Sequence, residues 1–221
     1  IISDVMMPDK DGIELTHELR ENLPTSHIPI ILLTAKSTLD SKLKGLEYGA
    51  NDNITKPFSS TYLKARVENL LVQHQKIQEL YRNNLMATPA AKQETQPLTN
   101  QMSAGDPAFI DKLIELMKQN MDNGELIVDD LVKELAVSRS VFFKKLKALT
   151  GLAPIEFIKE MRVSQAAELI VTGDYSISQV SYMVGINDPR YFSKCFKQKF
   201  GMTPSEYKDQ KLHANNQNIH S

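Results

Sequence analysis

The sequence has 221 residues, a length that accommodates one or two domains. Its 26 lysines and arginines nearly balance 27 aspartates and glutamates, so the formal net charge of −1 does not by itself indicate a nucleic-acid partner. A single cysteine, Cys195, excludes an intrachain disulfide and fits a reducing cytoplasm. No apolar run approaches the ~20 residues that span a bilayer, and no signal peptide is visible. We therefore expect a cytoplasmic chain without membrane contact.

The first segment alternates between strand and helix patterns. Residues 1–8 have the composition of the end of a buried strand and its loop, and residues 28–34 and 53–58 indicate two further strands. Apolar residues recur at helical spacing between them, and Gly49 ends the second helix. This alternation predicts an α/β layer with a parallel sheet. The chain begins inside an apolar run and not at a methionine, which suggests a fragment of a longer protein.

Three polar residues fall at the carboxyl ends of the predicted strands, where open α/β sheets place their sites: Asp4, Thr34 and Lys56. A carboxylate can attack a phosphoryl group as a nucleophile. A lysine can stabilise the charge on the phosphoryl oxygens, and a hydroxyl can follow the product. These residues predict an aspartyl-phosphate switch.

This segment resembles the receiver domain of two-component response regulators. The matching stretches are Ser3-Asp4-Val5-Met6-Met7-Pro8, Asp11-Gly12, Leu33-Thr34-Ala35, Gly49-Ala50 and Lys56-Pro57-Phe58. The resemblance implies that Asp4 accepts the phosphoryl group, that Thr34 reorients towards it and that Lys56 pairs with it. It also implies a Mg²⁺ ion held by Asp4 and the backbone carbonyl of Met6.

Two features depart from the receiver pattern. The family's first strand and its acidic pair are absent from this chain, so we expect an incomplete, flavodoxin-like receiver over residues 1–74 that takes up phosphate only in the full-length protein. Asn53 stands where the family usually carries a switch aromatic residue. A rival hypothesis is a phosphotransferase or haloacid-type hydrolase that uses Asp4, but those enzymes favour a second aspartate two residues later, where this chain has Met6.

Residues 75–105 are predicted to be a helical extension followed by a flexible linker, which begins at Ala87. A heptad-like stripe crosses the helix and makes a homodimer a candidate assembly; the alternative is a single helix packed on its own sheet. The stripe consists of Leu63, Val67, Leu70, His74, Ile77, Tyr81 and Asn84.

The second segment, residues 106–210, contains only helical patterns. The stretch 177–207 predicts two short helices around a turn at Gly185, and the second helix carries Phe192 and Phe196 inward. A similar unit precedes it, with a turn before Ser138. A long helix from Pro154 to Gly173 joins the two units, so we predict an all-α domain with two helix-turn-helix units.

Basic residues concentrate on the second helix of each unit. The stretches 139–147 and 190–199 each contain four basic residues and no acidic one. A solvated lysine face or a protein-interaction module are the alternatives to DNA binding, and the lack of acidic residues argues against the interaction module.

The second segment resembles the AraC/XylS family of transcription regulators. The resemblance rests on SRSVFFKKLKALTG in the first unit and on Gly185, Ile186, Tyr191-Phe192, Phe196-Lys197 and Phe200 to Tyr207 in the second. It implies that recognition helices about one DNA turn apart enter successive major grooves. Base-approaching positions then match Ser140, Phe143 and Lys144, and Arg190 and Lys194. Arg139 also lies off the apolar face, whereas Lys147, Lys197 and Lys199 are expected to meet phosphates.

Together these patterns predict a sequence-specific DNA-binding regulator controlled by aspartyl phosphorylation in a two-component phosphorelay. The alternative is the output end of a hybrid sensor histidine kinase, whose kinase part would lie upstream; the chain itself is not expected to be an enzyme. Expected partners are double-stranded DNA and a histidine kinase or phosphodonor domain, with RNA polymerase a further candidate. Residues 211–221 are predicted to be a disordered tail.

Overall fold

The computed structural model of the chain describes residues 1–35, 39–86 and 105–218. These residues form two compact units. The first comprises residues 1–81, 105–111 and 144–151, and the second comprises residues 82–86, 112–143 and 152–218. No described helix is long and apolar enough to cross a membrane.

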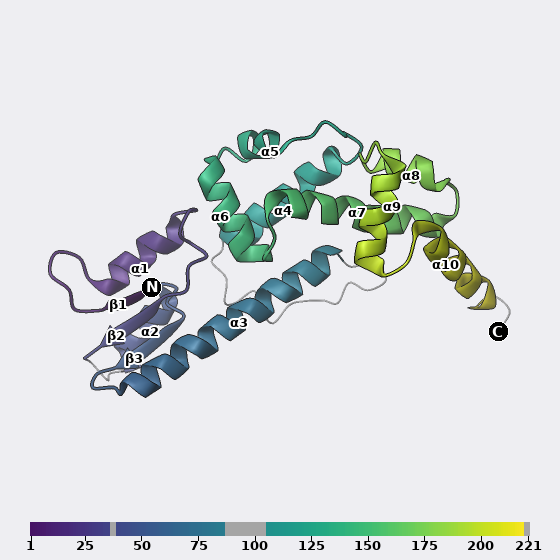
Figure 1. The fold of residues 1–221 in the computed structure, drawn as a ribbon. Coiled ribbons are helices and arrows are strands. Elements are labelled where there is room, and N and C mark those ends of the chain that lie inside the picture. Colours follow the sequence, from purple (N-terminus) through teal and green to yellow (C-terminus); the bar gives the residue numbers. More distant parts are fainter. Residues whose placement is uncertain (36–38, 87–104, 219–221) are drawn as a thin grey trace. The chain divides into compact units, whose positions relative to one another are not determined.

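A three-stranded parallel sheet organises the first unit, as the sequence predicts (Figure 1). Its strands are β1 (Ile2–Asp4), β2 (Ile31–Thr34) and β3 (Asp52–Thr55), in the order β1-β2-β3. Two helices, α1 (Gly12–Glu21) and α2 (Leu39–Glu47), lie in the crossovers. A parallel sheet with helical crossovers is buried, which explains why β2 is nearly all apolar.

Arg20 fixes the loops at the amino end of β2. Its guanidinium donates hydrogen bonds to the carbonyls of Ser26, Ile28 and Gly49, and to the side-chain oxygen of Asn51, at 2.7–2.8 Å. Gly49 has a φ of 92°, and a Cβ there would lie 2.8 Å from Arg20 Cγ. A glycine is required because the arginine stem passes so close to this turn.

Helix α3 (Ser60–Met86) continues past residue 74, as the predicted helical extension requires. Ile77 of the proposed heptad stripe is buried within the first unit, whereas Leu71, which lies outside the stripe, is exposed. The predicted flexible linker lies almost wholly outside the described residues.

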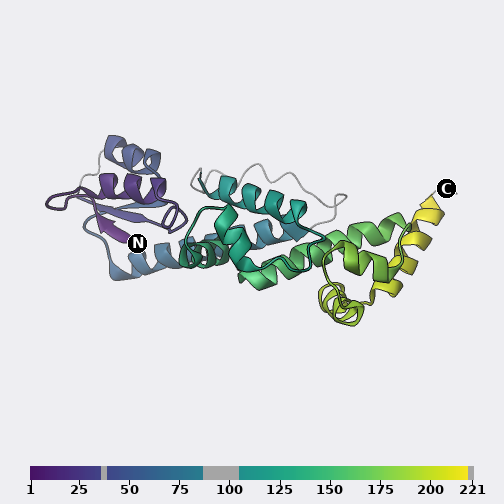
Figure 2. The same ribbon diagram turned by 90° about the horizontal axis from the view of Figure 1, so that it is seen from above.

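The helical segment contains α4 (Gly105–Gln119), α5 (Val128–Glu134), α6 (Arg139–Thr150), α7 (Pro154–Thr172), α8 (Ile177–Met183), α9 (Pro189–Phe200) and α10 (Pro204–Asn218). Helix α7 is the predicted connector, with Pro154 in its first turn and Gly173 ending it at a φ of 82°. Figures 1 and 2 show α8, α9 and α10 gathered around its carboxyl-terminal half. Their shared core is apolar and includes Ala166, Val184, Phe192 and Phe196.

The end of the chain differs from the prediction. Helix α10 runs to Asn218, through most of the stretch predicted to be disordered. Lys208 donates hydrogen bonds to the carbonyls of Gly173 and Tyr175, and Leu212 lies close to Gly173. These contacts hold the helix against the end of α7, and sequence composition does not reveal them.

Candidate phosphoacceptor site and DNA-binding surface

The sheet brings two of the three predicted switch residues into contact. Asp4 ends β1 and Thr34 ends β2, while Lys56 follows the last residue of β3. Since β2 lies between the other strands, Lys56 must reach across the end of β2, and its ammonium donates to the Asp4 carboxylate. This hydrogen bond with Lys56 lowers the pKa of Asp4, so the carboxylate stays ionised. Thr34 is buried beside them at the same edge of the sheet.

Gly12 allows the chain to pass close behind Asp4. A Cβ at residue 12 would lie 2.2 Å from the Asp4 carbonyl oxygen, which no side chain could accommodate. Asp11 caps α1 by accepting hydrogen bonds from the backbone N–H groups of Ile13 and Glu14, both at 2.8 Å. This Asp-Gly pair therefore starts α1 immediately beside the phosphoacceptor candidate.

The described residues offer few ligands for the predicted Mg²⁺ ion. The Asp4 carboxylate already contacts Lys56 and accepts a hydrogen bond from the Met6 backbone N–H at 3.2 Å. No group of three or more histidine, cysteine or acidic residues that could hold a metal occurs in the described part of the chain. Mg²⁺ usually keeps several of its waters and is bound through one or two carboxylates together with phosphate oxygens. Asp4 and Met6 therefore remain the predicted protein ligands, and the described residues add no acidic cluster to them.

The turn at Gly185 has the geometry of a helix-turn-helix. Gly185 has a φ of 70°, and a Cβ there would lie 2.7 Å from the Met121 carbonyl oxygen. Arg162 of α7 is buried beside this turn and donates to the carbonyls of Gly185 at 2.9 Å and Asn123 at 2.6 Å. Asp188 then caps α9 through the backbone N–H of Arg190 at 2.8 Å. The turn between α8 and α9 is thus held by Arg162 at Gly185 and by the Asp188 cap at the start of α9.

Helix α9 separates an apolar face from a basic face, as predicted. Phe192 and Phe196 are fully buried. The predicted DNA-binding residues Arg190, Lys194 and Lys197 are all exposed. Their charges therefore lie where a duplex could reach them.

Helix α6 presents a similar surface. Arg139, Ser140, Lys144 and Lys147 are exposed. Phe143 is half-buried, and the Arg139 guanidinium lies over its ring at 5.1 Å from the centroid. Arg139 also pairs with Asp129 of α5. An acidic neighbour therefore already orients Arg139, and one ring face of Phe143 is covered.

Two lysines of the basic stretches do not belong to these surfaces. Lys145 is 0% exposed and pairs with Asp106 of α4, whose side chain is 2% exposed. Lys199, which the sequence assigned to phosphate contact, pairs with Glu160 of α7 at 2.9 Å, and burial lowers its pKa. Each lysine fastens a predicted recognition helix to the rest of the fold, so phosphate contact by Lys199 is not supported.

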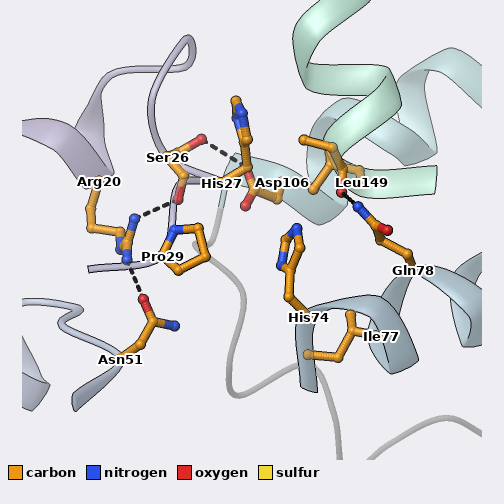
Figure 3. Close-up of a pocket in the computed structure, with 11 residues that line it drawn as sticks. Arg20, Ser26, His27, Pro29, Asn51, His74, Ile77, Gln78, Asp106 and Leu149 are labelled. Carbon is orange, nitrogen blue, oxygen red and sulfur yellow. Dashed lines mark hydrogen bonds between the residues drawn. The ribbon is translucent and has the colours of Figure 1, made fainter. Parts of the chain in front are cut away.

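A small polar pocket of about 30 Å³ lies within the first unit (Figure 3). Ser26 donates to Asp106 at 2.7 Å on one side of it, and the Lys145 ammonium donates to the same serine hydroxyl at 2.6 Å. His27 and His74 also line the pocket, and burial lowers the pKa of both. The space holds one or two water molecules, so it is too small for an organic ligand.

Comparison with known protein families accounts for both segments. The model of the response regulator receiver domain matches residues 1–68, and that of a helix-turn-helix domain matches residues 131–210. The chain contains a receiver domain and an AraC-type helix-turn-helix domain. Together, these domains indicate a DNA-binding response regulator.

Two relatives share long stretches with the chain. A protein named Histidine kinase P4, from Formosa agariphila, is 41% identical over 209 residues, which cover 95% of this chain and 15% of that protein. The phosphate regulon regulatory protein PhoB, from Pseudomonas aeruginosa, is 51% identical over 71 residues, which cover 32% of this chain and 31% of that protein. The chain therefore spans only a small part of the length of either relative.

Solved structures resemble the AraC-type domain. An AraC-type regulator from Chromobacterium violaceum is 27% identical, with a TM-score of 0.46, and the match covers 49% of this chain and 96% of that chain. The DNA-binding domain of AdpA, solved with a target DNA, is 25% identical, with the same TM-score of 0.46 and the same shares covered.

Sequence reasoning missed the residues that hold the AraC-type domain together. Asp106 and Glu160 pair with lysines that are distant in sequence, and Arg162 bonds to backbone carbonyls. One signal was present: Lys145 lies three residues after Phe142 and four before Leu149, on the helical face that these two buried residues share.

Proposed function

We propose that this chain is the DNA-binding output part of a two-component phosphorelay. It recognises a specific duplex sequence through α6 and α9, under the control of phosphorylation at Asp4. The observation that carries the proposal is the pair of exposed basic faces on these two helices, each fastened to its surroundings by a buried or half-buried lysine.

Each exposed residue has a separate role in this proposal. Arg190 and Lys194 read base edges from α9, since both side chains can bond guanine O6 and N7. Ser140, Phe143 and Lys144 approach bases from α6, with Phe143 placed to meet a thymine methyl. Arg139 is oriented by its ion pair with Asp129 and contacts the DNA from the start of α6. Lys147 and Lys197 contact phosphates and set the register.

The receiver supplies the switch. A carboxylate oxygen of Asp4 attacks the donor phosphorus, a bond from phosphorus to the donor's leaving group breaks, and the phosphoryl group becomes attached to Asp4. Lys56, which already pairs with Asp4, then stabilises the phosphoryl oxygens, and the Thr34 hydroxyl follows the new group. Mg²⁺, with Asp4 and Met6 among its ligands, would neutralise phosphoryl charge when bound in the intact protein.

We further propose the organisation around these activities. The receiver occupies residues 1–74, a helical extension and linker residues 75–105, and the AraC-type domain residues 106–210. The chain acts in the cytoplasm and takes phosphate from a histidine kinase or phosphodonor domain, and these two domains themselves supply no kinase activity. A homodimer through α3 and contact with RNA polymerase are further proposed associations.

A second candidate places the chain at the output end of a hybrid sensor histidine kinase. The relative named Histidine kinase P4 favours it, because 95% of this chain matches only 15% of that protein. The role of the two domains is the same in either case. The source of phosphate differs, being a separate kinase in one case and the same polypeptide in the other.

The proposal is tested by comparing Lys194→Ala with Lys197→Ala on a selected DNA site and a scrambled one, at several salt concentrations. Loss of a base reader should cost about 1–3 kcal/mol and relax the preference at one base pair. Loss of a phosphate contact should weaken both DNAs alike and reduce the salt slope by about one unit. Equal losses for both variants on both DNAs would mean that α9 binds by charge alone.

Phosphorylation is tested with a small-molecule phosphodonor and Mg²⁺. Wild-type protein containing the whole receiver should form acid-labile phosphate, and Asp4→Asn should not. Phosphate that persists in the Asp4→Asn variant would remove Asp4 from its proposed role.

A further inference from the structure

A solvent-open groove lies in the second unit where three segments of the chain meet. Ile127 comes from the loop before α5, Ile155, Ile158 and Lys159 come from the first turns of α7, and Ile186 comes from the turn before α9. We call it the connector groove. Its volume is about 500 Å³, within the ~300–1,000 Å³ typical of small-molecule sites.

The connector groove has an apolar floor and an apolar rim. Ile158 and Ile186 form the floor and are 8% and 6% exposed. Ile155 and Ile127 stand on the rim and are 72% and 58% exposed. The rim isoleucines are apolar side chains in contact with water at the edge of the groove, where a bound apolar group could cover them.

The more accessible of the unpaired positive charges in the groove belongs to Lys159. Lys159 is half-buried, one turn beyond Ile155, and forms no ion pair or hydrogen bond with any residue that the structure describes. Of the other two cations that line the groove, Arg139 pairs with Asp129. Arg162 is only 8% exposed and donates from two of its nitrogens to backbone carbonyls, while its Nε has no hydrogen-bond partner among the described residues. The groove therefore complements one negative charge attached to an apolar body.

We propose that the connector groove binds a small amphipathic carboxylate. The carboxylate pairs with the Lys159 ammonium, and the apolar body covers Ile155 and Ile127 above the floor. A hydrogen bond between an ammonium and a carboxylate is about twice as strong as one between neutral groups, because both partners are charged. A DNA backbone would satisfy the lysine but would leave the isoleucines uncovered. Binding of the carboxylate does not depend on the DNA-binding function proposed above.

The test uses two probes of the same shape, naphthylacetate and its uncharged amide, naphthylacetamide. Their affinities for the whole chain are measured by saturation-transfer NMR. Wild type should bind the acid about tenfold more tightly than the amide. Lys159→Met should remove this preference and leave amide binding unchanged. Ile155→Asp should weaken both probes. Lys118→Met, which removes an exposed lysine outside the groove, should behave as wild type.

The results that would overturn the proposal are equally specific. Absence of acid binding to wild type would refute it. So would an acid-over-amide preference that survives in Lys159→Met, because another cation would then hold the charge. If neither probe binds and Lys159→Met weakens binding to every DNA alike, Lys159 is a phosphate contact and DNA occupies the groove.

Discussion

Two adjacent lysines of α6 should respond in opposite ways to the same substitution. Lys145 is 0% exposed and pairs with the buried Asp106 carboxylate, whereas Lys144 is exposed. Lys145→Met leaves that carboxylate buried without its cation, and breaking such a pair costs about 3–5 kcal/mol of unfolding free energy. Lys144→Met removes only a surface charge and should change the unfolding free energy by less than about 0.5 kcal/mol.

Urea unfolding followed by helical circular dichroism measures the difference. The double variant Lys145→Met/Asp106→Leu should recover most of the loss, because it removes both charges from the interior. In DNA titrations the order reverses: Lys144→Met should weaken binding, and Lys145→Met, under conditions where it is folded, should not. Equal unfolding midpoints for the two single variants would refute the reasoning, since the burial of Lys145 would then carry no energetic consequence.

Three further changes probe the remaining features. Gly185→Ala should lower the unfolding free energy of the AraC-type domain by more than the strain of a positive φ alone, which is about 1–3 kcal/mol, because the new Cβ would also lie 2.7 Å from a carbonyl oxygen. Gly201→Ala is the matched control in urea unfolding, since Gly201 has a similar φ of 76° but a Cβ there would meet nothing within 4 Å. Lys56→Met should raise the pKa of Asp4, measured by carboxyl carbon NMR, and an unchanged titration would contradict their pairing. Burial lowers the pKa of His74 from 6.5, so the folded state binds fewer protons than the unfolded state and stability should fall as the pH drops below 6.5. His74→Gln should flatten that decline in unfolding midpoints, and an unchanged slope would assign it to other groups.

Much of the fold could be predicted because it depends on local pattern. Strand ends follow from apolar runs, so the meeting of Asp4 and Lys56 at one sheet edge was predictable from parallel topology alone. Gly185 and the phenylalanine spacing of α9 likewise predict a helix-turn-helix from the sequence alone.

The remainder depends on contacts between segments that are distant in sequence. From the sequence, Lys199 is expected to contact phosphate. Its actual partner, Glu160, lies on another helix, and the sequence does not reveal that the two side chains meet. Arg162 donates hydrogen bonds to backbone carbonyls. Because every residue has a backbone carbonyl, the residue types in the sequence do not show which ones Arg162 contacts. Helix α10 likewise contacts the end of α7 through Lys208 and Leu212, and it continues to Asn218 through a stretch whose composition resembles a solvated tail.

The Arg162 guanidinium joins the loop that leads into the first helix-turn-helix unit to the turn of the second. In the proposed complex, these hydrogen bonds and the connector helix α7 restrain the turn before α9 relative to the loop before α5. The spacing between the two half-sites of a DNA target can vary. One inserted base pair moves the second half-site by about 3.4 Å along the helix axis and turns it by about 35° around that axis. A protein with a flexible joint could follow that screw motion. This protein should instead measure the helical phase of its target and reject a spacing error of a single base pair, even when every contacted base is correct.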